Sequence, residues 1–165
     1  MEREKILYLV RHGKSSWGYE NITDIDRPLK NRGIRNAYEM ASKLVEKGTQ
    51  PDFIISSPAN RALHTATIFA SEMSRCYQAI KVEEIIYFSD EHTIYDFIKR
   101  TSDAVTTLMI FGHNPIISNL ANIFLKNQVD YIPTAGVVEL KFNVSSWMKI
   151  ERDNCFSEWY QTPKK

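Results

Sequence analysis

The sequence predicts an α/β fold in which a mostly parallel sheet is covered by helices on both faces. Three apolar runs, at residues 5–10, 52–56 and 106–111, are bounded by polar residues, as expected of strands buried on both faces. Segments with helical periodicity separate these runs along the chain. Alternation of strands and helices is typical of parallel sheets that carry helices on both sides.

The other strand candidates have different patterns. Residues 137–142 contain VELKF, whose alternation predicts an edge strand with one face in water. Residues 80–84 form a weaker candidate, and CFSEWYQ at 155–161 is suited to pair with the strand at 137–142.

Four segments are predicted to be helices: 31–46, 59–73, 92–99 and 115–125. The apolar stripe of the first would consist of Ile34, Ala37, Tyr38, Ala41, Leu44 and Val45. Gly48 follows this helix as a natural C′ residue. The last helix would begin with Asn114 as a cap residue and Pro115 at its first position.

Length and composition indicate one globular domain over residues 1–165. The net charge of +1 carries no signal for nucleic acid or a membrane surface. The apolar run at 5–10 is too short for a signal sequence or a membrane span, so we expect a cytoplasmic protein. Cys76 and Cys155 lack CxxC spacing and are interpreted as free thiols, without a disulfide or a zinc site.

Unusual polar residues follow three of the predicted strands. The first strand ends in RHG, the second in SSPANRA and the third in GHNP. Ligands of such sheets bind outside the carboxyl ends of the strands, so these segments should meet at one rim. Each alone is also compatible with a solvated strand end or a helix cap, but three together favour a site. Its candidate residues are Arg11, His12, Arg61 and His113.

These four side chains are suited to a phosphoryl group. Guanidinium groups match phosphate oxygens bidentately, and a neutral histidine nitrogen can act as a nucleophile. Further donors would be the backbone N–H groups of Gly13 and of the helix start after Asn114. We expect no metal and no cofactor, because side chains supply the positive charge. We interpret His64 as structural and His92 as a surface residue.

The chain resembles the histidine phosphatase superfamily, which is phosphoglycerate mutase-like, and more narrowly its short SixA-type phosphohistidine phosphatases. Four stretches carry the resemblance: LVRHGKSSW, DIDRPLKNRG, SSPANRALHTA and FGHNPIISNLA. They occur in the family's order and at its approximate spacing over about three quarters of the chain. The resemblance implies a three-layer fold with a six-stranded sheet, in which the strand before His12 lies beside the strand before His113.

The resemblance also implies roles for the site residues. His12 would be the nucleophile that becomes phosphorylated, Arg11 and Arg61 would hold the phosphoryl oxygens, and His113 would complete a positive pocket. Arg27 would border the pocket in the short branch, whereas Ser57 is interpreted as structural. We further expect the neighbouring arginines to lower the pKa of His12, and its second ring nitrogen to donate to a backbone carbonyl.

Larger members of the superfamily carry insertions that form a lid and supply a glutamate as general acid. This chain has little room for such insertions. The acidic residues Glu83, Glu84, Asp90 and Glu91 have no evident match there, and a role for Asp26 or Glu84 stays open. An imidazole leaves more easily than an alkoxide and needs less help from a general acid. The lack of an evident acid therefore indicates phosphohistidine on a protein as the substrate.

Two alternatives remain: a phosphatase of small phosphoesters on the same catalytic frame, and a non-catalytic phosphate-binding module. A nucleotide-binding P-loop is disfavoured, because GKSS at 13–16 lacks the upstream glycine and Tyr8 stands there instead.

Overall fold

A computed structural model describes residues 4–75 and 77–165 of the chain. A six-stranded sheet lies at its centre, in the order β3-β2-β4-β1-β5-β6. The strands are β1 (Lys5–Arg11), β2 (Phe53–Ser56), β3 (Ile80–Val82), β4 (Thr107–Gly112), β5 (Val137–Phe142) and β6 (Cys155–Gln161). The β3–β2, β2–β4 and β4–β1 pairs are parallel, whereas β5 is antiparallel to both of its neighbours. The predicted mostly parallel sheet is therefore confirmed.

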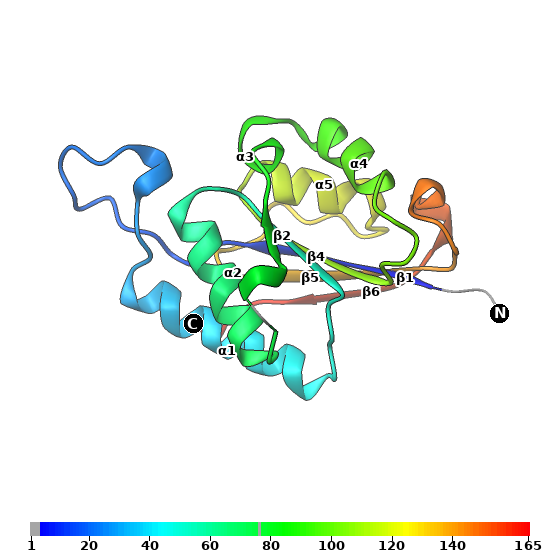
Figure 1. The fold of residues 1–165 in the computed structure, drawn as a ribbon, viewed down its shortest axis with the longest axis horizontal. Coiled ribbons are helices and arrows are strands. Elements are labelled where there is room, and N and C mark those ends of the chain that lie inside the picture. Colours follow the sequence, from blue (N-terminus) through cyan, green and yellow to red (C-terminus); the bar gives the residue numbers. More distant parts are fainter. Residues whose placement is uncertain (1–3, 76) are drawn as a thin grey trace.

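Helices cover both faces of this sheet (Figure 1). They are α1 (Asn31–Glu46), α2 (Asn60–Glu72), α3 (Ile85–Phe88), α4 (Glu91–Lys99) and α5 (Ile116–Phe124). Alternate residues of β1 point to opposite sides, as a strand requires. Leu7 and Leu9 join the core that contains the buried side chains of α4 and α5, while Tyr8 and Val10 join the core under α1 and α2. The result is a three-layer α/β fold.

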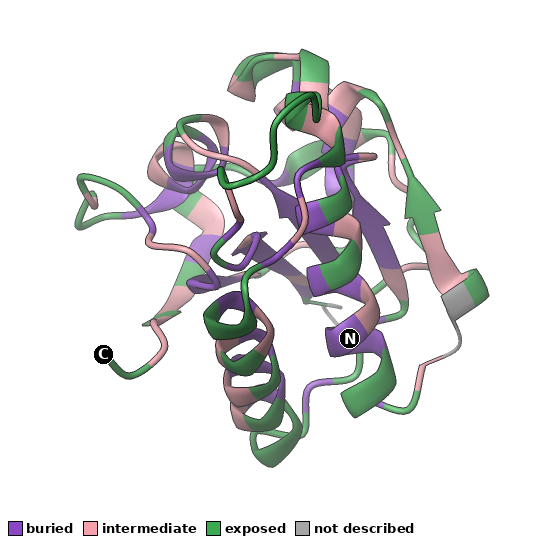
Figure 2. Cartoon of the chain, turned by 90° about the vertical axis from the view of Figure 1, so that its left-hand side faces the viewer, coloured by how far each residue is buried: buried purple, intermediate pink, exposed green. Residues whose placement is uncertain are grey.

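Figure 2 views the molecule from the side on which the parallel strands end. The strands at the centre are buried, and exposed residues lie on the outer faces of the helices around them (Figure 2). This is the rim on which the candidate residues were predicted to meet. In the described part of the chain, no helix has both the length and the apolar character needed to cross a bilayer.

The prediction of an edge strand at 137–142 is wrong. β5 lies between β1 and β6, and its residues from Val137 to Leu140 are buried. The alternation of apolar and polar residues in VELKF arises because Glu139 faces polar partners inside the protein and not solvent. The Tyr8 hydroxyl donates to its carboxylate, and Lys47 Nζ lies 3.7 Å from it. The predicted pairing of 155–161 with this strand is confirmed, and β6 is the edge.

Two details of the predicted helices also need correction. In α1, Tyr38 and Val45 are exposed and Met40 is buried in their place, so the buried stripe is narrower than predicted. Asn114 is not a cap and Pro115 is not the first helical residue: Pro115 is itself the N-cap of α5. The C′ position of Gly48 is confirmed by its positive φ of 78°.

Of the two cysteines, Cys155 is free and buried, as predicted for a free thiol. Cys76 lies outside the described residues.

The loop after β1 is held against the first turn of α1 by two glycines. A Cβ on Gly13 would lie 2.7 Å from the Gly33 carbonyl oxygen, and a Cβ on Gly33 would lie 2.7 Å from the Lys14 backbone nitrogen. The Lys30 N–H donates to the Lys14 carbonyl at 2.8 Å and continues the contact. The backbone beside His12 therefore depends on the absence of a side chain at both positions.

We expect Gly33→Ala to lower the free energy of unfolding by about 1–3 kcal/mol, because the new methyl group forces two backbone segments apart. Urea denaturation measures the change. Gly18→Ala is the matched control, because its Cβ would meet its nearest atom at 3.5 Å and Gly18 itself has no positive φ. Equal stabilities of the two variants would contradict the close approach as a constraint.

Candidate active site

The two histidines of the predicted site lie side by side at the ends of β1 and β4. The register pairs Arg11 with Gly112, so that His12 and His113 each follow a paired residue. The His12 N–H donates to the Gly112 carbonyl at 3.1 Å. The ring centroids of His12 and His113 are 5.2 Å apart. The predicted adjacency of the two strands therefore brings the two imidazoles together.

The hydrogen bonding of His12 determines which of its nitrogens is available. Its Nδ1 lies 2.7 Å from the Gly13 carbonyl oxygen, which can only accept, so Nδ1 carries the proton. The neutral ring then presents an unprotonated Nε2. This confirms the expected donation to a backbone carbonyl.

The pKa of His12 is lowered to about 3. Burial is the largest cause, because the side chain is 6% exposed, and the nearby His113, Arg61 and Arg11 lower the pKa further. The bond to Gly13 acts in the opposite direction. The expectation that the neighbouring arginines lower this pKa is confirmed, and desolvation contributes more than they do.

His113 is also held in its neutral form. Burial and then Arg61 lower its pKa to about 4, while Asp24 opposes the shift. The expectation that His113 itself adds positive charge is therefore wrong for the free protein at neutral pH. Its Nε2 lies 2.7 Å from Ser57 Oγ, and its Nδ1 is buried without a hydrogen-bond partner in the described structure.

Ser57 therefore belongs to the site, contrary to the purely structural interpretation. Its hydroxyl oxygen also accepts from the Ala59 N–H at 3.2 Å, at the start of α2. The sequence SSP indicates a turn before a helix, and the contact with His113 depends on the β2–β4 pairing.

Asp24 anchors two arginines beside the histidines. Arg61 donates from Nη1 to the Asp24 carbonyl oxygen at 2.7 Å and from Nη2 to Asp24 Oδ2 at 3.0 Å. Arg27 donates from Nε to Asp24 Oδ1 at 3.1 Å. Both guanidinium groups are nearly buried, with Arg61 5% and Arg27 8% exposed. The predicted position of Arg27 beside the pocket agrees with this geometry.

The third arginine, Arg11, is held by a different segment. Its Nη1 donates to the Ile132 carbonyl at 2.9 Å. Arg11, Arg27 and Arg61 all lower the pKa of His113, so all three lie within electrostatic reach of it. The structure thus brings together Arg11, His12, Arg61 and His113.

Several polar nitrogens in this cluster are buried and lack hydrogen-bond partners in the described residues. They are Arg11 Nε, Arg27 Nη1, Arg61 Nε and His113 Nδ1. A buried donor without an acceptor is costly, and native proteins keep few of them. A tetrahedral oxyanion such as phosphate has the charge and the acceptor oxygens that these donors require.

Sequence reasoning missed Asp24 and Tyr87. The Tyr87 hydroxyl donates to Asp24 Oδ2 at 2.6 Å, and its ring packs edge-on against His113 with centroids 5.4 Å apart. The Tyr87 hydroxyl is the largest cause that lowers the pKa of Asp24 to about 2, followed among the lowering causes by Arg61. Asp24 was visible in DIDRPL, three residues before Arg27. Tyr87 gave no signal, because only the tertiary fold places α3 over His113.

The Gly13 N–H, predicted as a further donor, already has a partner within the protein, and so does the side chain of Asn114. The Gly13 N–H donates to Thr65 Oγ1 at 3.0 Å and is therefore already satisfied. The Asn114 side chain donates to the Ile132 carbonyl at 2.8 Å and accepts from Ser118 Oγ at 2.6 Å. Both residues support the surrounding backbone: the loop packs tightly enough that their polar groups find internal partners.

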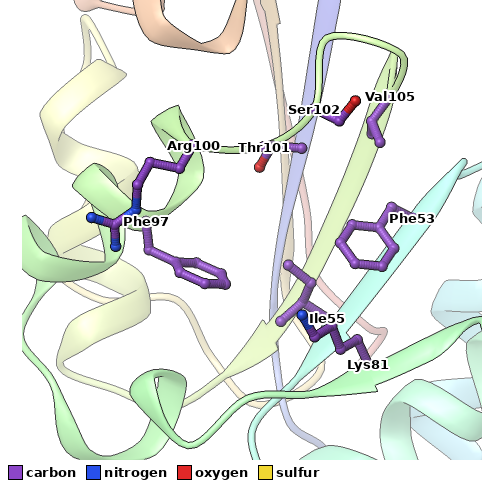
Figure 3. A pocket seen from close by; sticks show the side chains of 8 residues that line it. All are labelled: Phe53, Ile55, Lys81, Phe97, Arg100, Thr101, Ser102 and Val105. Carbon is purple, nitrogen blue, oxygen red and sulfur yellow. The ribbon is translucent and has the colours of Figure 1, made fainter.

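The remaining histidines and an apolar cavity lie apart from this cluster. His64 is exposed and lines a groove with Pro28 and Asn60, and His92 is exposed at the start of α4. Within the described residues, no three His, Cys, Asp or Glu side chains are grouped so as to hold a metal ion. Figure 3 shows a cavity of about 410 Å³ whose apolar walls include Phe53, Phe97 and Val105. Phe53 begins β2 and Val105 precedes β4, whereas His113 follows the end of β4.

Comparison with known proteins agrees with this geometry. Residues 7–88 match the model of the histidine phosphatase superfamily (branch 1). An uncharacterized protein of Mycobacterium tuberculosis is 30% identical over 152 residues, which cover 86% of this chain and 92% of that protein.

Among solved structures, the putative phosphohistidine phosphatase SixA from Agrobacterium tumefaciens superposes with a TM-score of 0.76 at 25% identity, covering 82% of this chain and 90% of the other. The protein histidine phosphatase SixA complexed with tungstate has the same fold, with a TM-score of 0.79 at 16% identity, over 96% of this chain and 97% of the other. The paired histidines, the family match and the near full-length relative lead to one conclusion: this chain belongs to the histidine phosphatase superfamily.

Proposed function

We propose that this protein hydrolyses phosphohistidine carried on a polypeptide, through a phosphorylated His12 intermediate. The observation that carries the proposal is the state of His12: a buried imidazole with Nδ1 bonded to a backbone carbonyl and Nε2 unprotonated. Only an unprotonated nitrogen can attack phosphorus, and a pKa of about 3 keeps His12 in that form at neutral pH.

In the proposed reaction, the His12 Nε2 attacks phosphorus and the P–N bond of the substrate breaks. The substrate imidazole takes a proton on its ring and leaves as a neutral group. Water then attacks the phosphoryl group on His12 and releases phosphate, which restores the enzyme. Arg11 and Arg61 neutralise the phosphoryl oxygens in both steps, and the partnerless nitrogens of Arg27 and His113 are available for further hydrogen bonds.

The acidic side chains near the site support a P–N bond as the one that breaks. Asp24, with a pKa of about 2, is ionised at neutral pH and has no proton to give to an alkoxide. Other carboxylates considered from the sequence have separate partners: Asp26 accepts from Thr23 Oγ1, Glu83 pairs with Lys81, and Asp90 caps α4. An imidazole leaving group needs no strong acid from the enzyme.

Exposed aromatic side chains next to the site support a polypeptide substrate. Trp17 is 75% exposed and lies over the Arg27 guanidinium at 3.4 Å. Phe88 is 70% exposed and packs against Tyr87, and Tyr131 is 62% exposed and affects the pKa of Arg11. Aromatic residues are enriched where proteins contact one another. Of the two solved structures compared above, one is described as a putative phosphohistidine phosphatase and the other as a protein histidine phosphatase.

The substrate class is tested by comparing phosphate release from a histidine-phosphorylated peptide and from a panel of phosphorylated metabolites. We expect kcat/KM for the peptide to exceed that for the metabolites by a factor of roughly 10²–10⁴. This factor is the contribution of the general acid that phosphoester hydrolysis would need. Comparable values for a metabolite would instead indicate a phosphatase of small phosphoesters. Binding of phosphate without any turnover would indicate a binding module.

The nucleophile is tested by acid-labile incorporation of labelled phosphate. We expect wild type to form the phosphoenzyme and His12→Ala to lose both the label and turnover, by several orders of magnitude, as removal of a nucleophile usually does. His64→Ala is the control, because this exposed histidine lies outside the cluster. If His12→Ala is labelled at the normal rate, another residue is the nucleophile.

The protonation states are tested by NMR titration of the ring Cε1–H signals, assigned from the His12→Ala and His113→Ala spectra. A lowered pKa means that the neutral form persists to lower pH. Neither signal should therefore titrate between pH 8 and pH 5, since both rings become protonated only near pH 3–4. A midpoint for His12 at about 6.5, the value of a free imidazole, would contradict the neutral nucleophile.

A further inference from the structure

A basic pocket lies beside the proposed phosphoryl site and shares Arg11 with it. Its volume is about 470 Å³. Of its eleven lining residues, five are lysine or arginine and, in this described part of the chain, none is aspartate or glutamate. The basic residues are Arg11, Lys14, Arg32, Lys164 and Lys165. Their charge exceeds what one phosphoryl group requires, and the proposed mechanism uses only Arg11.

The walls of this basic pocket come from four separate segments, and each is held by hydrogen bonds. Lys14 is fixed by the Lys30 N–H bond to its carbonyl, at 2.8 Å. The segment that carries Tyr131 is tied to β1 by the bond from Arg11 Nη1 to the Ile132 carbonyl. The C-terminal segment is tied to α1, where the Lys164 N–H donates to Glu39 Oε1 at 3.0 Å. Figure 1 shows the C-terminus beside α1.

The positive charge of the pocket is only partly offset by neighbouring carboxylates. Of the carboxylates in the described structure, none lies within 4.0 Å of the charged nitrogens of Lys14, Arg32, Lys164 or Lys165. Glu39 lies within electrostatic reach of Lys164, but its carboxylate pairs with Lys43 at 2.9 Å. Clustered like charges repel one another, and a bound anion relieves that repulsion.

We infer that this basic pocket binds carboxylate side chains that flank the phosphohistidine on the substrate polypeptide. The inference rests on the proposed function and extends it to the class of substrate sequence. Arg11 contributes to the pocket and to the environment of His12, so an anion there lies next to the phosphoryl group. Tyr131 is an exposed aromatic residue in the wall of the same pocket. It offers an apolar surface to a polypeptide, whose apolar groups inorganic anions lack.

The test uses two histidine-phosphorylated peptides of equal length, one with glutamates flanking the phosphohistidine and one with glutamines at the same positions. The wild-type protein should hydrolyse the glutamate peptide with a kcat/KM about three- to tenfold higher, the effect of a few exposed charge pairs. High salt should reduce this ratio, because exposed charges are screened.

Lys14→Gln/Lys164→Gln removes one charge from each of two walls and should bring the ratio close to one. Lys126→Gln/Lys149→Gln is the matched control: it removes the same net charge from residues outside the pocket and should keep the wild-type ratio. A wild-type ratio of one, or an equal loss in the control, overturns the inference and leaves the proposed function intact. Failure to hydrolyse either peptide overturns the proposed function, and the inference with it.

Discussion

The parallel pairing of β1 with β4 is the constraint on which the site depends. It places Arg11 opposite Gly112, and the next residue of each strand is a histidine. Both strands are buried at the centre of the sheet, so a shift of register would turn whole rows of apolar side chains toward the wrong layer. The separation of 5.2 Å between the two imidazoles is thus maintained by the cores on both faces and not by contacts of the imidazoles alone.

The same burial gives the site its electrostatic character. Removal of His12 and His113 from water is the largest reason why both are neutral, and the arginines add to it. Asp24 compensates part of the arginine charge and holds Arg27 and Arg61 in place through its two carboxylate oxygens. Neutral imidazoles and fixed cations therefore lie within a few ångströms of one another, an arrangement that suits phosphoryl transfer.

The loop between β1 and α1 contributes both to the packing of the fold and to the surface beside the site. Its first residues pack against Gly33 through Gly13, and its 3₁₀ turn at Asp24–Asp26 supplies the carboxylate that anchors the arginines. Its outer part exposes Trp17 over Arg27, and Lys14 faces the basic pocket. One segment thus contributes to the backbone beside His12, to the orientation of the arginines and to the surface offered to a substrate.

The sequence by itself determined the alternation of strands and helices, the four residues Arg11, His12, Arg61 and His113, and their place at the strand ends. These are local properties: runs of apolar residues, helical periodicity and short polar motifs at boundaries. Only the tertiary structure decided which groups Ser57, Gly13 and Asn114 contact, that β5 is internal, and that Tyr87 and Asp24 join the site. Those features depend on pairing between residues far apart in the chain, such as Tyr8 with Glu139. The local sequence pattern does not indicate which distant element provides a hydrogen-bond partner.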